Sequence, residues 1–159
     1  MGSLKTFIVT VSDTRTLDND ASGDTLAEML IEFGAQISGK LIVSDDLSSI
    51  ENTLRSVAER DDVNLIITTG GTGLGPRDNT PEATKRVIDK EAPGLAEAMR
   101  RETYSKTPLS MLSRAICGVS GHTLIVNLPG SPKAVKECFE VIQPVLDHAI
   151  RLINGDTKH

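Results

Sequence analysis

The apolar residues of this chain fall into short runs, and five of them have the length and β-branched content of strands. These runs cover residues 6–11, 36–43, 63–67, 113–119 and 123–128. The third run is almost entirely aliphatic, which is typical of a strand buried on both faces of a parallel sheet. Only Ser120-Gly121-His122, a turn sequence, separates the last two runs, so they predict a hairpin-like pair.

Between these runs, most of the sequence has apolar residues at helical spacing. A polar segment, residues 14–20, predicts a surface loop, and Ser22-Gly23-Asp24 then opens a first helix that ends at Gly34. Ser48 and Glu51 form a capping box at the start of a second helix. The apolar faces of these two helices consist of Leu26, Met29, Leu30, Phe33, Ile50, Leu54, Val57 and Ala58.

Three further helices follow the third run. Thr80 provides a capping oxygen and Pro81 a first helical residue for a helix over residues 81–89. Residues 94–103 form the next, with Leu95, Ala98 and Met99 predicted to face inward. The last helical pattern spans residues 135–153 and contains Pro144, which predicts a kink or two abutting helices.

The order of these elements predicts the fold class. Strands alternating with helices through short connections give a parallel sheet with helices on both faces, and the hairpin makes the sheet mixed. We therefore expect an α/β protein, a three-layer α/β/α sandwich with a mostly parallel (mixed) sheet. At 159 residues, the whole chain (1–159) is expected to be a single domain.

Composition excludes several classes of partner. A net charge of -5 and 3% aromatic residues argue against nucleic-acid binding, and no apolar run approaches the ~20 residues of a membrane span. Cys117 and Cys138 lie among apolar residues, which favours a reduced, cytoplasmic chain with packing thiols. The histidines, His122, His148 and His159, do not have zinc-ligand spacing. Residues 1–6 match the myristoylation pattern around Gly2, but residue 6 enters the first strand, so we expect no acylation.

Candidate chemistry gathers where strands end. The third run is followed by TTGGTGLGPRDNTPEAT, residues 68–84, in which four glycines precede a helix start. Backbone N–H groups and a helix N-terminus at the carboxyl end of a strand favour an anion. The fifth run has the same design, because Pro129-Gly130-Ser131-Pro132-Lys133 follows it. A Pro-Gly-Ser-Pro sequence alone is consistent with a tight turn, but the two loops together predict a pocket for a ligand with two phosphates.

The common nucleotide motifs do not fit the first loop. Gly70 and Gly75 have the P-loop separation, but Pro76-Arg77 stands where that motif has Lys and Ser/Thr. The third glycine of a dinucleotide fingerprint would fall at Pro76. A P-loop kinase and a dehydrogenase are therefore disfavoured.

Polar residues also follow the first three runs. Ser12, Asp13, Asp45 and Asp78 would share one edge of a parallel sheet, where oxygen ligands suit a Mg²⁺ ion that bridges protein and nucleotide phosphates. The alternative for each aspartate is a turn or cap residue. The sequence leaves open whether the carboxylates converge.

These segments carry a resemblance to a known family. TVSDT at residues 10–14, the glycine loop at 68–84, LSRA at 112–115 and NLPGSPKAVKEC at 127–138 closely resemble the molybdopterin adenylyltransferases of molybdenum cofactor biosynthesis, the MogA and MoaB group, and the G domain of gephyrin. The likeness extends over almost the whole chain. Pro76-Arg77-Asp78, which some MoaB-type members lack, is intact here.

The resemblance implies a molybdopterin-binding-like fold, a homotrimer, and transfer of AMP from Mg-ATP to the terminal phosphate of molybdopterin with release of pyrophosphate. It also implies that the product passes to a molybdate-insertion protein. The residue roles that it implies are catalytic or Mg²⁺-binding for Asp45 and Asp78, and nucleotide- or phosphate-binding for Ser12, Asp13, Gly70, Gly71, Thr72 and Gly73. The residues that the resemblance implies for molybdopterin binding are Ser113, Pro129, Gly130, Ser131 and Lys133.

Two other functions remain open at this point. One is a non-catalytic molybdopterin-binding module, against which the intact Asp78 argues. The other is a nucleotide-diphosphate pyrophosphatase, because domains of competence-damage proteins are also similar to this sequence.

Overall fold

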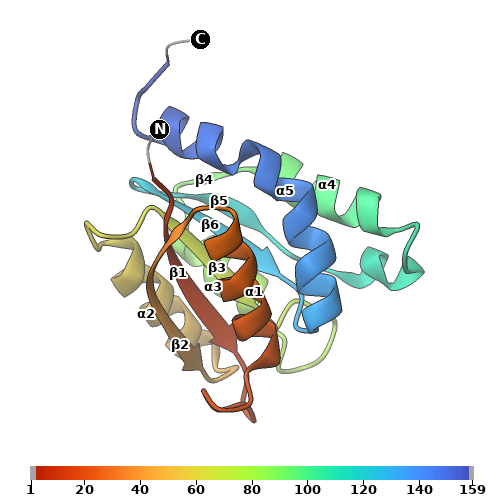
Figure 1. Cartoon of the computed structure of the whole chain (residues 1–159). Coiled ribbons are helices and arrows are strands. Elements are labelled where there is room, and N and C mark those ends of the chain that lie inside the picture. Colours follow the sequence, from red (N-terminus) through yellow and green to blue (C-terminus); the bar gives the residue numbers. More distant parts are fainter. Residues whose placement is uncertain (1–2, 158–159) are drawn as a thin grey trace.

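The computed structural model describes residues 3–157 of the chain, and a six-stranded mixed sheet lies at its centre (Figure 1). The strand order is β2-β1-β3-β6-β5-β4. Strands β1, β2, β3 and β6 run parallel to one another, while β5 is antiparallel to β6 and β4 antiparallel to β5. The strands are β1 (Lys5–Val11), β2 (Gln36–Val43), β3 (Leu65–Thr69), β4 (Lys90–Glu91), β5 (Cys117–Ser120) and β6 (Thr123–Leu128).

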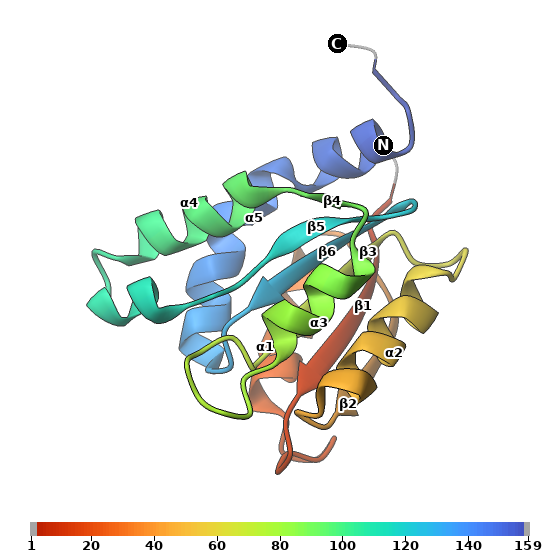
Figure 2. The same cartoon turned by 180° about the vertical axis from the view of Figure 1, so that it is seen from behind.

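Helices cover both faces of the sheet, so the predicted three-layer sandwich is confirmed (Figures 1 and 2). Helices α1, α4 and α5 contribute to one hydrophobic core and α2 and α3 to the other. The helices are α1 (Ala21–Glu32), α2 (Leu47–Ala58), α3 (Thr80–Val87), α4 (Pro93–Thr103) and α5 (Pro132–Ile153), with a 3-10 helix η1 (Pro108–Leu112).

The strand ends differ from the sequence prediction. Strand β3 continues through Thr69, two residues further than predicted, because Thr68 and Thr69 pair with the end of β6. The fourth predicted run becomes a strand only from Cys117, and the short helix η1 before it was not predicted. The hairpin of β5 and β6 is confirmed. The later end of β3 places the glycine loop directly at the sheet edge.

Three predicted helix starts were wrong in detail. The cap of α2 is Asp46, whose carboxylate accepts from the N–H of Ser49, so the expected capping box is absent there. Thr80 does not cap α3, because its hydroxyl donates to the carbonyl of Gly70 instead. The cap of α1 is Asp20, which we had placed in a surface loop but which is completely buried. At α1 and α3 the side chain concerned also makes a contact outside the helix, Asp20 with Thr10 and Thr80 with Gly70.

Two further helix predictions can be compared with the structure. In α4, Ala96 and Met99 are buried, whereas Leu95 and Ala98 are only partly buried, so the inward face is rotated from the predicted one. Helix α5 is one continuous helix with Pro144 inside it, and it changes direction partway along its length (Figure 1). A proline removes one hydrogen bond of the helix ladder, which accounts for a bend.

Cys117 and Cys138 are free and buried, as predicted for packing thiols. Burial raises the pKa of Cys117 to about 12 and that of Cys138 to about 11, so both stay protonated at neutral pH. No helix within residues 3–157 is both long enough and apolar enough to cross a membrane. The predictions that concern Gly2 and His159 lie outside the described residues.

Phe139 tests the core between α5 and the sheet. Its ring is fully buried and meets the ring of Phe33 edge to face, with centroids 6.2 Å apart. We expect Phe139→Ala to lower the free energy of unfolding by about 3–5 kcal/mol, because it removes a buried aromatic ring and leaves a cavity. Urea unfolding measures this loss. Val145→Ala in the same helix is the control, since Val145 is 47% exposed and should change stability by less than about 1 kcal/mol.

Candidate functional site: an anion cradle and a carboxylate group at one sheet edge

The carbonyl groups of the glycine loop after β3 accept hydrogen bonds from residues outside the loop turn. The carbonyls of residues 70 and 71 accept from the hydroxyl and the N–H of Thr80, at 2.9 and 3.1 Å. Those of residues 72 and 73 accept from the N–H and Nε of Arg114, both at 2.8 Å. Within the described chain, the N–H groups of residues 71–73 have no hydrogen-bond partner. A backbone with its carbonyls held behind it and its N–H groups free is an anion cradle.

Glycine is required at the start of this loop. Gly70 and Gly71 have φ of 98° and 69°, a left-handed region that side chains rarely adopt. A Cβ on Gly70 would lie 2.5 Å from the carbonyl oxygen of Val11. The glycines therefore let the chain turn tightly against the end of β1.

The loop after β6 has the same design and touches the first. The carbonyl of Leu128 accepts from the N–H of Gly70 at 3.1 Å, and that of Pro129 from the hydroxyl of Thr69 at 2.7 Å. The carbonyl of Gly130 accepts from Arg15 at 3.0 Å. The N–H groups of Gly130 and its successor Ser131 have no partner among the residues that the structure describes. The predicted pair of anion-binding loops is thus one continuous surface.

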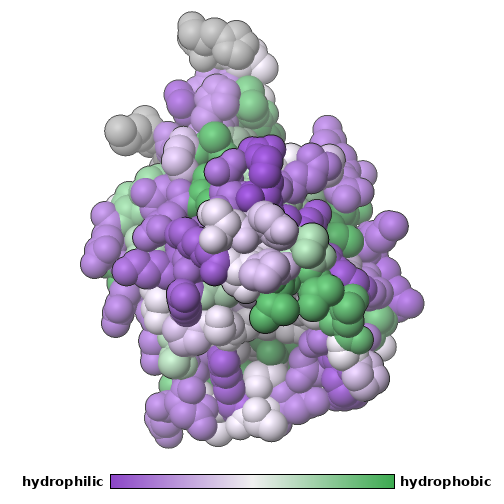
Figure 3. All heavy atoms as spheres, turned by 90° about the vertical axis from the view of Figure 1, so that its right-hand side faces the viewer, coloured by the Kyte–Doolittle hydropathy of each residue, from purple (hydrophilic) through white to green (hydrophobic). Residues whose placement is uncertain are grey.

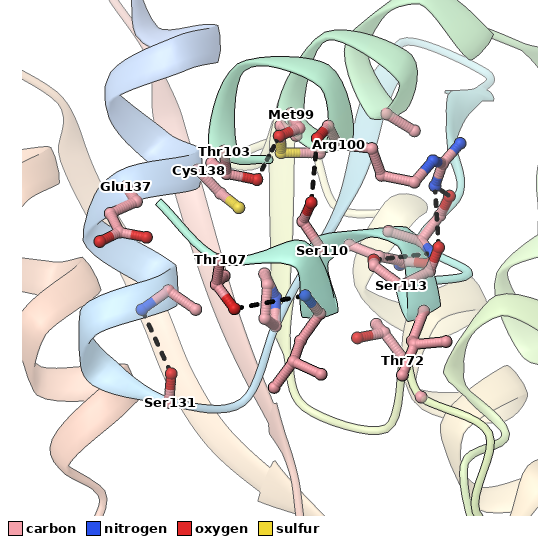
Figure 4. A pocket seen from close by; sticks show the side chains of 18 of the residues that line it. Thr72, Met99, Arg100, Thr103, Thr107, Ser110, Ser113, Ser131, Glu137 and Cys138 are labelled. Atoms are coloured by element: carbon pink, nitrogen blue, oxygen red, sulfur yellow. Dashed lines mark hydrogen bonds between the residues drawn. The ribbon is translucent and has the colours of Figure 1, made fainter. Parts of the chain in front are cut away.

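A cavity of about 500 Å³ opens beside the two loops, between α4, η1 and the start of α5 (Figure 4). Its volume is in the range of small-molecule sites. Six predicted site residues line it, namely Thr72, Gly73, Ser113, Pro129, Ser131 and Lys133. Its walls also include apolar side chains of α4 and η1, such as Met99, Leu109 and Leu112. The cavity thus combines an apolar wall with free N–H groups at one end.

The predicted carboxylates lie outside this cavity and form a second group. Asp13 and Asp45 each accept from the backbone N–H of the other, at 3.0 and 2.8 Å. Arg77 donates to both oxygens of Asp13, at 3.1 and 3.0 Å. The Arg77 guanidinium, and after it the N–H of Asp45, holds the pKa of Asp13 below its usual value. Burial, and after it the charge of Asp13, raises the pKa of Asp45. The loops after β1, β2 and β3 therefore meet at one cluster of charges.

Asp78 is connected to this cluster through the next residue, Asn79. Asn79 donates to the carbonyl of Asp45 at 2.9 Å, while the Asp78 carboxylate accepts from the N–H of Gly75 at 2.8 Å and closes its own turn. Arg114 donates to the carbonyl of Asp78, also at 2.8 Å. Asp78 thus stands on the loop that joins the carboxylate group to the anion cradle.

The structure brings most predicted site residues to one edge but does not assemble a finished metal site. Ser12 forms the turn after β1, where its hydroxyl accepts from the N–H groups of Thr14 and Arg15. No group of three or more His, Cys, Asp or Glu side chains in residues 3–157 is arranged to hold a metal ion. The roles predicted for Asp45, Asp78, Ser12 and Asp13 remain predictions.

Sequence reasoning missed the arginines that hold the site together. Arg15 came from a segment judged to be a surface loop, and Arg114 belonged to a quoted motif without a role. Each binds backbone carbonyls of a glycine loop. No periodicity marks such residues, because their partners are backbone atoms far away in sequence.

The fold and this edge define an α/β protein with a candidate site for an anionic small molecule at the carboxyl ends of its strands. The sequence pattern of a family described as "Probable molybdopterin binding domain" matches residues 7–148. The chain belongs to this molybdopterin-binding domain family.

Curated relatives agree with this assignment. The chain is 39% identical to a molybdopterin adenylyltransferase of Helicobacter pylori over 142 residues, which are 86% of this chain and 79% of that protein. It is 40% identical to molybdenum cofactor biosynthesis protein B of Halalkalibacterium halodurans, with 97% and 92% covered. It is 44% identical to the molybdenum cofactor synthesis protein cinnamon of Drosophila melanogaster over 99% of this chain, but spans only 27% of that longer protein.

Solved structures confirm the fold. A crystal structure of molybdenum cofactor biosynthesis protein B superposes with a TM-score of 0.92 at 37% identity, covering 96% of this chain and 97% of the other. The Mog protein of Mycobacterium ulcerans gives 0.88 at 40% identity, with 95% and 99% covered. The arrangement of strands and loops described above is thus shared with molybdopterin biosynthesis proteins.

Asp45 provides a test of the electrostatics at the site. Its folded-state pKa is raised, so the stability linked to this carboxyl is fully present below its ordinary value of 3.8 and is lost as the pH rises through the folded value. We expect Asp45→Asn to unfold at a higher temperature than the wild type at pH 7, because the amide oxygen still accepts from Asp13 without a second charge. The difference should shrink towards pH 3. Thermal unfolding across this pH range measures it.

Asp46→Asn is the matched control on the next residue. Hydrogen bonds from Ser49 lower the pKa of Asp46, so its stabilisation is present above 3.8 and is lost as the pH falls through its folded value. This variant should not gain stability at pH 7. Equal behaviour of the two variants would contradict the assignment of repulsion to the Asp13–Asp45 pair.

Proposed function

We propose that this chain is a molybdopterin adenylyltransferase, which transfers AMP from Mg-ATP to the terminal phosphate of molybdopterin and releases pyrophosphate. The observation that carries the proposal is the contact between two glycine loops whose carbonyls are tied back and whose N–H groups are free. A reaction between two phosphates needs such a surface, because both reactants are anions that must approach each other. Two relatives that are 36% and 39% identical are named molybdopterin adenylyltransferases, which supports this activity. Two others, 40% and 44% identical, are named for molybdenum cofactor synthesis.

We assign molybdopterin to the cavity and the nucleotide to the carboxylate side of the cradle. The cavity has room for one pterin, its apolar wall suits a flat ring, and Ser113, Ser131 and Lys133 lie on its lining. Thr72 and Gly73, whose N–H groups are free, line this cavity, and their loop continues to Arg77, which binds Asp13 of the carboxylate cluster. A phosphate from each side would meet there.

The reaction requires no nucleophile from the protein. An oxygen of the pterin phosphate attacks the α-phosphorus of ATP in line, the bond between the α-phosphorus and the bridging oxygen breaks, and pyrophosphate leaves. The protein contributes position and charge neutralisation. The free N–H groups of the two loops would hold the pterin phosphate and the α-phosphate. Lys133, which is largely exposed and lies 3.9 Å from Glu137, would supply a positive charge at the cavity.

Mg²⁺ forms part of the proposal, and the donor set fits it. Carboxylate oxygens are the ligands that Mg²⁺ prefers, and the raised pKa of Asp45 marks a place where an added cation would relieve repulsion. When bound, the ion would neutralise charge on the phosphates. Asp45 and Asp78 would hold it. Because fewer than three acidic side chains converge, phosphate oxygens of the nucleotide would have to complete the coordination.

A cytoplasmic location and transfer of the product to a molybdate-insertion protein complete the proposal. The two buried free thiols support a reducing compartment. Product transfer follows from the resemblance alone.

The deciding experiment incubates the chain with molybdopterin, ATP and magnesium and follows adenylylated molybdopterin and pyrophosphate. We expect both products in equal amounts. Pterin binding without product would support the binding-only alternative instead. Release of AMP from ADP-ribose in the absence of pterin would support the pyrophosphatase.

Asp78→Asn tests the carboxylate that stands between the two halves of the site. The amide oxygen can still accept from Gly75, so the loop and pterin binding should survive, while turnover falls by about 100-fold because a charge is lost near the reacting phosphates. Single-turnover kinetics and pterin binding measure the two effects. Asp89→Asn is the control, since its carboxylate accepts from the N–H of Gly121 at the opposite end of β6 and should leave turnover unchanged.

A homotrimer is also proposed, from the resemblance and from exposed apolar residues. Tyr104, Leu109, Met111 and Leu112 are exposed on or beside η1. Figure 3, which views the side of the molecule where α4 and η1 lie, shows hydrophobic residues gathered on that face. Light scattering should give three times the mass of the 17.0 kDa chain, and a monomer at all concentrations would refute the trimer.

A further inference from the structure

Asp20 is a completely buried carboxylate behind the site. It accepts from the hydroxyl of Thr10 at 2.6 Å and from the N–H of Gly23 at 3.1 Å. Two cations also lie beside it, Arg15 at 3.6 Å and Lys40 at 3.5 Å. A buried charge is costly unless it is paired, so the site depends on these partners.

The two cations beside Asp20 make their other contacts in different parts of the protein. Lys40, on β2, also pairs with Asp24 of α1. Arg15, whose side chain is 30% exposed, reaches the loop after β6 and donates to the carbonyl of Gly130 at 3.0 Å. It also donates to the hydroxyl of Ser22. Of these two cations, Arg15 is therefore the one that connects the buried carboxylate to a glycine loop.

The bond to Gly130 has a consequence for the next N–H group. The carbonyl of Gly130 and the N–H of Ser131 belong to one planar peptide unit and point in opposite directions. An arginine that holds the carbonyl oxygen therefore also fixes where the Ser131 N–H points. That N–H is one of the free donors of the second loop, and Ser131 lines the cavity.

We propose that Arg15 is a positioning residue, which Asp20 orients from the buried side and which aims the N–H of Ser131 at the phosphate of the pterin ligand. A guanidinium suits this task because its planar fork donates to Ser22 and Gly130 at fixed angles while its charge lies 3.6 Å from Asp20. The ligand assignment rests on the proposed function. The effect on the orientation of the peptide does not.

Arg15→Ala, with Lys40→Gln as matched control, tests the proposal by two independent measurements. Each variant removes one of the two cations beside Asp20, so a general effect on folding appears in both. In the adenylylation assay, Arg15→Ala should raise KM for molybdopterin about tenfold and change kcat by less than about twofold, because the bond is made to ground state and transition state alike. Lys40→Gln should leave both constants near the wild-type values.

The second measurement does not depend on activity. The ¹⁵N order parameter of the Ser131 amide should fall from about 0.85, a rigid backbone, to below about 0.6 in Arg15→Ala alone. If the Ser131 amide stays rigid, or if Lys40→Gln loosens it equally, Arg15 is not a positioning residue. If the amide loosens but the wild type makes no adenylylated pterin, the proposed function fails and the positioning role stands.

Arg15→Lys separates position from charge. A lysine keeps the positive charge but cannot serve Ser22 and Gly130 with one rigid fork. We expect it to leave KM at least about fivefold above the wild type. Complete restoration of KM and of the Ser131 order parameter would show that charge is sufficient and would overturn the proposal.

Discussion

The site depends on one constraint, which is that the carbonyl groups of both glycine loops are held from behind. Peptide units carry a donor and an acceptor in opposite directions, so tying the oxygens of residues 70–73 and 128–130 to the protein leaves the N–H groups for a ligand. Thr80, Arg114, Thr69 and Arg15 provide these ties, together with the N–H of Gly70, which holds the carbonyl of Leu128. The glycines allow the turn, but the groups that bind the carbonyl oxygens determine the direction in which the backbone N–H groups point.

This arrangement joins residues that are distant in the chain. Arg114 lies after η1 and binds the loop after β3, whereas Arg15 lies after β1 and binds the loop after β6. The carboxylate group adds the loop after β2 through Asp45 and Asn79. The parallel strands bring four loop ends to one edge, and the hydrogen bonds between the loops turn that edge into a single surface. The arrangement of the strands in the sheet therefore determines which loops form the site.

The same edge contains an unfavourable electrostatic interaction between two carboxylates. Asp13 and Asp45 lie close enough to exchange backbone hydrogen bonds, and the pKa of Asp45 is raised by burial and by its neighbour. Arg77 offsets part of this repulsion. Such a group does little for the stability of the fold, and the proposed phosphate ligand with Mg²⁺ would give it a function.

Hydrophobic periodicity by itself determined the layered α/β architecture, the hairpin of β5 and β6, and the glycine loops at strand ends, because burial of apolar faces is a local property of the sequence. The resemblance to the molybdopterin adenylyltransferases also indicated Ser113, Ser131 and Lys133, which the structure brings to one cavity. Only the tertiary structure decided that Asp20 is buried, that Thr80 binds Gly70 and does not cap α3, and that Arg15 reaches Gly130. These contacts join residues 10 to 115 positions apart, and a local sequence pattern contains no information on them.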